Sequence, residues 1–301
     1  MEDSHIAEVD LGDGNGLFGV FDGHGGREVA KFVQNHFTKN LINCEAYKRK
    51  DFKLALENTF LKMDRLLLTE KGKQELRKYM EQDNDNGGYQ DYLRQVESAA
   101  GCTATVALIT QTEIYCANAG DSRTVMCERG HAVDLSKDHK PELPEERARI
   151  VKAGGEVQEG RVNGMLSLSR AIGDFDFKPI TPPKDAQPTW FLNNHMVTVY
   201  PDVTVKPFHK DVEFLVLACD GVWDCKTSDQ VIQYFRKIMP LNPNLKEIHN
   251  TTHNILDEIC PNTFDEMRDN DGIGSDNMTV IIVDFLQNSG GAKGHMSLSQ
   301  N

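Results

Sequence analysis

The chain has 301 residues, a net charge of −13 and seven cysteines. Its length suffices for one large domain or two small ones, and its acidic charge argues against a nucleic-acid or anionic-membrane partner. The odd cysteine count, without a Cys-x-x-Cys pair, indicates reduced thiols and a cytoplasmic or nuclear compartment. No apolar run is long enough to span a membrane and the acidic start is unlike a signal peptide, so we expect no membrane partner.

The first half of the chain changes from helical to strand-like patterning. Apolar residues recur at helical spacing over 26–42 and 51–68, and Asp51 is a suitable N-cap for the second helix. Residues 81–92 are polar and contain glycine, which predicts a surface loop. Short β-branched or apolar segments separated by turn residues then predict consecutive antiparallel strands over 103–109, 113–117 and 123–127.

The second half mixes helices and strands without strict alternation. A helix is expected to begin at Pro144 and to end before Gly154, whereas the prolines within 177–195 disfavour regular structure. Strands are predicted over 197–199, 203–207, 213–219 and 278–286, and helices over 228–239 and 244–260. This order favours an α+β fold with antiparallel sheets and helices packed outside them. The small, polar tail over 288–301 is predicted to be disordered.

Two acidic segments far apart in the chain carry the strongest chemical signal. Asp22 and Asp220 each end an apolar run and are followed at once by glycine. Taken singly, either aspartate could be a turn residue that ends a strand. Burying a carboxylate costs several kcal/mol unless a cation or strong donors compensate it, and converging carboxylates repel one another. Mg²⁺ and Mn²⁺ take oxygen ligands, so together the segments favour a site for these ions.

Short motifs spread over about 280 residues identify a resemblance. The chain resembles the metal-dependent serine/threonine protein phosphatases of the type 2C (PPM) family, whose fold is two stacked antiparallel β-sheets flanked by α-helices, an αββα sandwich. The segments that carry the resemblance are Met1-Glu2-Asp3, Asp22-Gly23-His24-Gly25-Gly26, Gly101-Cys102-Thr103-Ala104, Gly120-Asp121-Ser122-Arg123, Asp138-His139-Lys140-Pro141, Leu168-Ser169-Arg170-Ala171-Ile172-Gly173-Asp174, Asp220-Gly221-Val222-Trp223-Asp224 and Gly274-Ser275-Asp276-Asn277-Met278-Thr279.

The resemblance implies hydrolysis of phosphoserine and phosphothreonine in proteins by a metal-bridged water at a binuclear Mg²⁺ or Mn²⁺ centre. Asp22 would bridge both ions, and the Gly23 carbonyl with Glu2 would serve one of them. Asp220 and Asp276 would hold the second ion, and Asp3 would contact a metal-bound water. Asp121 and Asp224 would bind a third, more weakly held ion.

His24 matches the family's proposed general acid, and its unperturbed pKa of about 6.5 suits it to protonate a leaving serine or threonine oxygen. It could instead be a satisfied turn histidine. Arg170 and Asp174 are expected to brace a loop near the cleft. The chain has neither the cysteine-to-arginine spacing of cysteine phosphatases nor a P-loop, so covalent cysteine and nucleotide triphosphate chemistry lack support.

One departure from the family pattern concerns the start of the chain. The family has a strand upstream of its Met-Glu-Asp segment that carries a phosphate-binding arginine, and the sequence begins at Met1. We therefore expect a catalytic domain over 1–287 that lacks this strand. The residue that binds the substrate phosphate is left unassigned, and Arg27 is a candidate to replace the missing arginine because it lies close to His24 in the sequence. The alternatives are a catalytically impaired scaffold that binds protein partners and a hydrolase of small phosphate esters. Phosphoprotein substrates and a monomeric state are expected.

Overall fold

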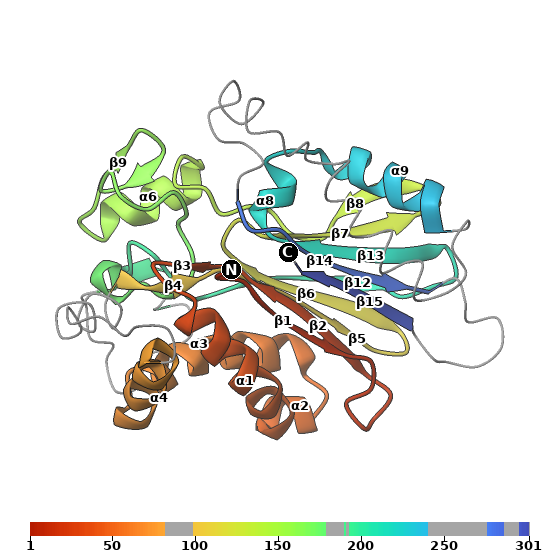
Figure 1. Ribbon diagram of the computed structural model, residues 1–301, viewed down its shortest axis with the longest axis horizontal. Helices are drawn as coiled ribbons and strands as arrows, with labels where there is room; N and C mark the ends of the chain where they lie inside the picture. The colour runs from red at the N-terminus through yellow and green to blue at the C-terminus, as the bar shows by residue number, and fades with distance from the viewer. Residues whose placement is uncertain (82–98, 179–189, 191–192, 240–275, 286–294, 301) are drawn as a thin grey trace.

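The computed structural model describes residues 1–81, 99–178, 190, 193–239, 276–285 and 295–300. Its centre is formed by two five-stranded antiparallel sheets that lie face to face (Figure 1). The first sheet has the order β1 (Ser4–Glu8), β2 (Gly16–Phe21), β5 (Ala104–Ile109), β6 (Glu113–Ala119) and β12 (Asp202–Pro207). The second has the order β15 (His295–Gln300), β14 (Thr279–Asp284), β13 (Val212–Ala218), β7 (Arg123–Glu128) and β8 (His131–Asp134).

Strand β2 shows why the central strands read as continuous apolar runs. All six of its residues are buried, because one face packs on the second sheet and the other on helices. Phe18 and Val20 belong to the core between the sheets, together with Leu215 and Leu217 of β13. Leu17 and Phe21 belong to the core beneath the helices. A strand buried on both faces has no polar alternation, which explains its uninterrupted pattern.

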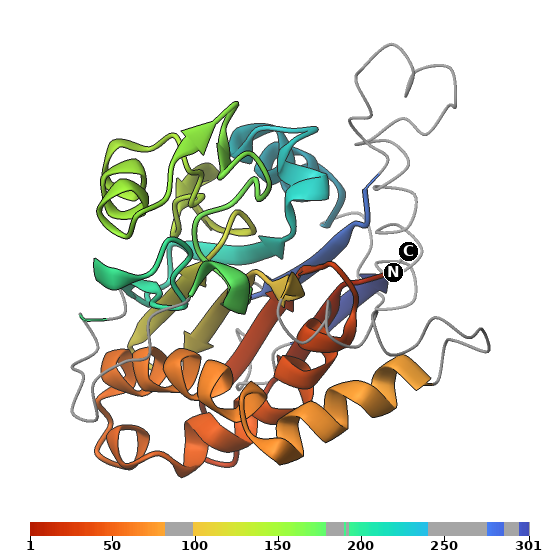
Figure 2. The same cartoon turned by 90° about the vertical axis from the view of Figure 1, so that its left-hand side faces the viewer.

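Helices cover the outer faces of both sheets (Figures 1 and 2). The first sheet is covered by α1 (Glu28–Asn43), α2 (Glu45–Lys48), α3 (Phe52–Leu67) and α4 (Glu70–Glu81). Asp51 caps α3, accepting a hydrogen bond from the Leu54 amide at 3.3 Å, as its sequence position predicts. The second sheet is covered by α9 (Ser228–Ile238), which packs Val231, Ile232 and Phe235 onto it.

Shorter elements gather at the end of the sandwich where β2 and β13 finish (Figure 1). A small sheet joins β11 (Ile172–Gly173), β4 (Gly101–Cys102) and β3 (Gly23–His24). Beside it lie α6 (Pro144–Lys152), the hairpin β9 (Val157–Gln158) and β10 (Arg161–Val162), and the 3₁₀ turn η1 (Phe175–Phe177). Helix α8 (Asp220–Trp223) follows β13 directly.

The α+β sandwich predicted from the sequence is confirmed, with differences in single elements. The strand predicted at 197–199 is only a bridge between Thr198 and Arg170. Residues 295–300 of the predicted disordered tail form β15, the edge strand of the second sheet, which pairs with β14. The alternating polar and apolar residues of β15 have the period of a strand. Helix α4 was not predicted. The predicted helix at 244–260, most of the predicted loop at 81–92 and residues 288–294 lie outside the described residues.

Candidate metal centre

The two predicted aspartates are brought together by the ends of strands in different sheets. Asp22 follows β2, and Asp220 follows β13 as the first residue of α8. The two side chains share a hydrogen bond. The central strands of the two stacked sheets therefore deliver both carboxylates to one end of the sandwich.

Asp3 joins the same group from the first sheet. Ligand atoms of Asp3, Asp22 and Cys219 all lie within 4.8 Å of one another. Asp3 is buried, and its Oδ2 accepts a hydrogen bond from Thr279 Oγ1 at 2.7 Å. Cys219 differs, because burial raises the pKa of its thiol well above the ordinary value. A neutral thiol is a poor ligand for a hard dication, so Cys219 supports the site without belonging to its donor set.

The remaining predicted carboxylates surround this group. Asp276 is exposed, and its charge acts on Asp3 and on Asp224. Asp121 is buried in the turn between β6 and β7, and its charge acts on both Asp22 and Asp220. Glu2 lies at the edge, where its backbone amide donates to Asn277 Oδ1 at 2.7 Å and its charge reaches His24.

The electrostatics of this cluster favour a bound cation. Burial, followed by the charges of Asp3 and Asp220, raises the pKa of Asp22 far above its ordinary value. Burial, with the charges of Asp121 and Asp224, also raises the pKa of Asp220. Carboxylates this close cannot all ionise unless a positive charge neutralises them. Divalent cations do this and lower the pKa of each ligand.

Two buried oxygen atoms show that the donor set fits a hard cation. Among the described residues, Asp3 Oδ1 and Asp121 Oδ1 are fully buried and lack a hydrogen-bond partner. Such oxygens cost free energy unless something binds them. Both belong to carboxylates, the ligands that Mg²⁺ and Mn²⁺ prefer.

Gly23 lets the backbone pass close to the N-terminal segment. A Cβ atom at this position would lie 2.5 Å from the carbonyl oxygen of Glu2, so any other residue would push the two segments apart. Glycine is therefore required between Asp22 and His24 for Glu2 to lie at the cluster. This close approach keeps the predicted ligands of one ion together.

His24 has a partner that the sequence analysis assigned to another role. Its Nε2 lies 2.8 Å from Oδ2 of Asp174, which is fully buried. Burial by itself would lower the pKa of His24, but the charge and hydrogen bond of Asp174 outweigh it, and the pKa is raised. Asp174 therefore does more than brace a loop: it orients the imidazole and favours its protonated form.

The pair of His24 and Asp174 rests on a second glycine. A Cβ atom at Gly101 of β4 would lie 2.4 Å from Asp174 Oδ2 and 2.7 Å from His24 Nε2. The side chains therefore pack directly on the backbone of β4, which has no room for a larger residue. Arg170, by contrast, does brace the fold, through ion pairs with Glu146 and Asp202.

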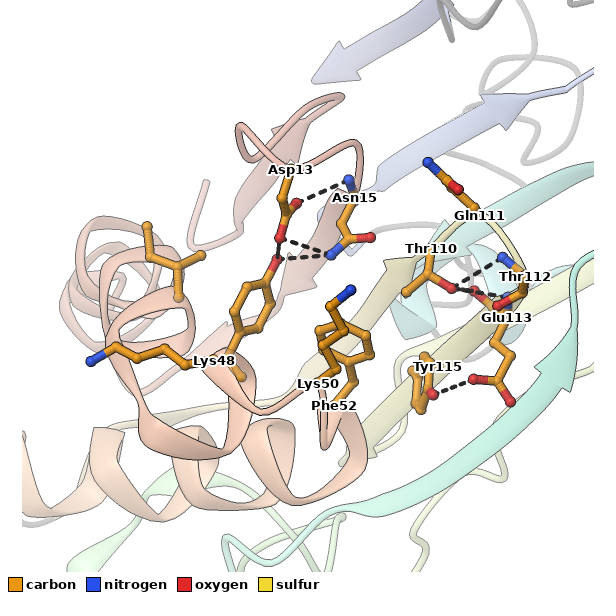
Figure 3. A pocket seen from close by; sticks show the side chains of 12 residues that line it. Asp13, Asn15, Lys48, Lys50, Phe52, Thr110, Gln111, Thr112, Glu113 and Tyr115 are labelled. Carbon is orange, nitrogen blue, oxygen red and sulfur yellow. Dashed lines mark hydrogen bonds between the residues drawn. The ribbon is translucent and has the colours of Figure 1, made fainter.

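Two cavities differ in their relation to the cluster. One of about 500 Å³ adjoins it and is lined in part by Asp3, Arg27 and Lys31. Another of about 690 Å³ lies at the opposite end of β2, around Asn15 and Tyr47 (Figure 3). The polar groups of this second cavity bond to one another, as where Asn15 Nδ2 donates to the Tyr47 hydroxyl at 3.1 Å. None of the predicted site residues lines it.

Comparison with known proteins decides the family. Residues 1–270 match the family model described as protein phosphatase 2C. A probable protein phosphatase 2C 2 from Paramecium tetraurelia is 42% identical, over 94% of this chain and 87% of that protein. The chain belongs to the protein phosphatase 2C family. A protein phosphatase 2C homolog 2 from Schizosaccharomyces pombe is 40% identical, over 96% of this chain and 70% of that protein.

The fold agrees with this membership. A serine-threonine phosphatase 2C from Toxoplasma gondii superposes with a TM-score of 0.65 at 20% identity, covering 94% of each chain. Protein phosphatase 2C enzymes are metal-dependent serine/threonine phosphatases, and this chain is an enzyme of that class. No helix in the described part of the chain has the length and apolar character needed to cross a membrane. Asp276 lies beyond the residues that the family model matches.

Proposed function

We propose that the chain hydrolyses phosphoserine and phosphothreonine in proteins at a binuclear Mg²⁺ or Mn²⁺ centre. Asp22, Asp220, Asp276, Glu2 and the Gly23 carbonyl would hold the ions, and Asp3 would hold a metal-bound water. The observation that carries this proposal is the convergence of Asp3, Asp22 and Asp220, with an unpartnered buried oxygen on Asp3.

The chain's own residues supply the proton that the leaving group needs. When bound, two divalent ions would lower the pKa of a water molecule and neutralise the phosphate oxygens. His24 donates a proton to the departing serine or threonine oxygen. Because Asp174 engages Nε2, the ring nitrogen left for this transfer is Nδ1. Protonation by a positioned histidine is worth about 10²- to 10⁴-fold in rate.

The phosphate group is held from the side of α1. Arg27 and Lys31 line the same cavity as Asp3, so a phosphate at the cluster has cationic side chains within that cavity. This placement supports Arg27 as the substitute that its proximity to His24 in the sequence indicates. Arginine and lysine both bind phosphate oxygens through charge-assisted hydrogen bonds.

Phosphate release from a phosphothreonine peptide tests the proposed function. We expect turnover with Mn²⁺ or Mg²⁺ and its loss in a chelator, with recovery when the ion is restored. Asp220→Asn should abolish turnover while circular dichroism shows a retained fold, because it removes a ligand and leaves the strand intact. Activity that survives complete chelation would exclude a metal-dependent reaction. Retained metal binding without turnover would favour a phosphatase-like scaffold instead.

The choice of leaving group tests the pair of His24 and Asp174. An alkoxide leaving group needs a proton, whereas a 2,4-dinitrophenolate does not. Asp174→Asn should therefore lower kcat on the phosphothreonine peptide about 10²-fold. On 2,4-dinitrophenyl phosphate we expect a loss of less than about threefold from the same general-acid argument. Steady-state kinetics on both substrates measure the difference.

Asp176→Asn is the matched control, because Asp176 is exposed and lies two residues away in η1. It should leave both substrates unaffected. An equal loss on both substrates in Asp174→Asn would show that Asp174 acts through the fold or the metal ions, and not through proton donation by His24.

A further inference from the structure

Lys140 forms an ion pair inside the carboxylate cluster. Its Nζ lies 2.5 Å from Oδ2 of Asp121, which is 1% exposed. The other carboxylate oxygen of Asp121, Oδ1, is buried and lacks a partner in the described part of the chain. The charge of Lys140 also acts on Asp220 and Asp224. An ammonium group therefore stands among carboxylates that otherwise repel one another.

The backbone around Lys140 is fixed to the turn that carries Asp121. The amide of His139 donates to the Gly120 carbonyl at 3.0 Å, and the Gly120 amide donates to His139 Nδ1 at 3.2 Å. His139 itself is buried. Because these bonds hold the residues before Asp121 and before Lys140 together, the ion pair is built into the fold and is more than a chance surface contact.

The Lys140 side chain also borders a cavity whose lining residues do not include Asp121. Lys140 lines a cavity of about 620 Å³ together with the acidic residues Asp134, Asp138 and Asp202. About a third of the Lys140 side chain is exposed, 37% of its maximum. The ammonium group can therefore move from Asp121 into this cavity, where Asp138 and Asp202 are already paired with Arg123 and Arg170.

We propose that Lys140 is a tethered cation that competes with a third divalent ion for Asp121 and so sets the metal concentration at which that ion binds. This inference rests on the proposed metal centre. With Lys140 in place, Asp121 Oδ2 is neutralised, and a third ion that uses this oxygen must displace the ammonium group. Without Lys140, both oxygens of Asp121 are open to the ion, and the neighbouring charge of Asp224 attracts it.

Direct measurement of Mn²⁺ binding tests this proposal without relying on turnover. We compare the wild type with Lys140→Met and with Lys137→Met by calorimetry and by electron paramagnetic resonance of free Mn²⁺. Lys137 is a matched control, since its exposed side chain pairs with Glu145 at 2.6 Å and its removal changes the net charge equally. Lys140→Met should tighten the weakest binding step about tenfold, the effect of an ion pair of about 1.4 kcal/mol. Lys137→Met should change it less than about twofold, as for an exposed pair.

Two further variants separate charge from packing. Lys140→Arg keeps the cation and should bind Mn²⁺ as the wild type does. Asp121→Asn should remove the weakest step in both the wild-type and the Lys140→Met backgrounds. The proposal is overturned if Lys140→Met and Lys137→Met bind Mn²⁺ alike, or if Lys140→Met weakens every step. Absence of any tight Mn²⁺ step in the wild type would instead overturn the proposed function, and this inference with it.

Discussion

Replacing Asp22 by asparagine is expected to remove most of the activity and, at the same time, to stabilise the metal-free protein. The metal centre is worth several kcal/mol of transition-state stabilisation, so kcat/KM should fall by at least about a thousandfold at 1.36 kcal/mol per tenfold. The same carboxylate is forced against Asp3 and Asp220 when no cation is bound. Its neutral replacement should raise the free energy of unfolding by about 1–3 kcal/mol, because active-site charges are held at a cost in stability.

The pH dependence of this gain follows from the direction of the pKa shift. The pKa of Asp22 is higher in the folded chain than in the unfolded chain, so the metal-free fold loses stability as the pH rises above about 4. The increase in unfolding free energy that Asp22→Asn gives the metal-free protein should be near zero at pH 4 and should grow toward neutral pH. Urea unfolding in a chelator measures it, with Asp176→Asn as the surface control. Saturating Mn²⁺ should reverse the order, since only the wild type binds the ions fully. A metal-free variant less stable than the wild type at pH 7 would refute the repulsion argument.

The sequence predicted the strands that deliver the site because both of them are apolar on every face. Asp22 and Asp220 each end such a run, where either one alone could be a turn residue, and the two together with the surrounding motifs favour metal ligands. Their convergence needed the order of strands in both sheets, which the motifs implied only through the family resemblance. The ligand assignments remain predictions, although the structure places Asp3, Asp22 and Asp220 together.

Contacts between residues far apart in the chain, and one weakly patterned helix, were not predicted from the sequence. Asp174 lies 150 residues from His24, and only the close packing over Gly101 shows that they meet. Helix α4 is rich in charge and contains Gly72, so its apolar positions Leu76 and Met80 gave too weak a pattern to predict it. Lys140 belongs to a family motif, but its contact with Asp121 depends on a loop folded back onto Gly120.

Replacing Glu146 by alanine should produce the largest loss of stability that we expect from a single change. Glu146 is 1% exposed and lies between two buried guanidinium groups, 2.6 Å from Arg149 Nη1 and 2.6 Å from Arg170 Nη2. Ser169 Oγ donates to the same carboxylate at 2.5 Å. Removing the anion leaves two buried cations without it, which costs about 3–5 kcal/mol. Because these residues join α6 to the loop before the small sheet, activity should fall with stability.

The pH dependence of Glu146→Gln separates charge from packing, since glutamine keeps the shape. Burial would raise the pKa of Glu146, but hydrogen bonds from Arg170 and the charges of both arginines lower it to about 2. A group with a lowered pKa stabilises the fold above its unfolded pKa of about 4.3 and loses this effect as the pH falls further. The difference in unfolding free energy between wild type and Glu146→Gln should therefore be constant above about pH 5 and shrink between pH 4.3 and 2, from the same linkage. The neighbouring Glu145→Gln, an exposed residue paired with Lys137, should cost less than about 0.5 kcal/mol. A constant difference down to pH 2 would show that Glu146 stabilises the fold by packing and hydrogen bonding without its charge.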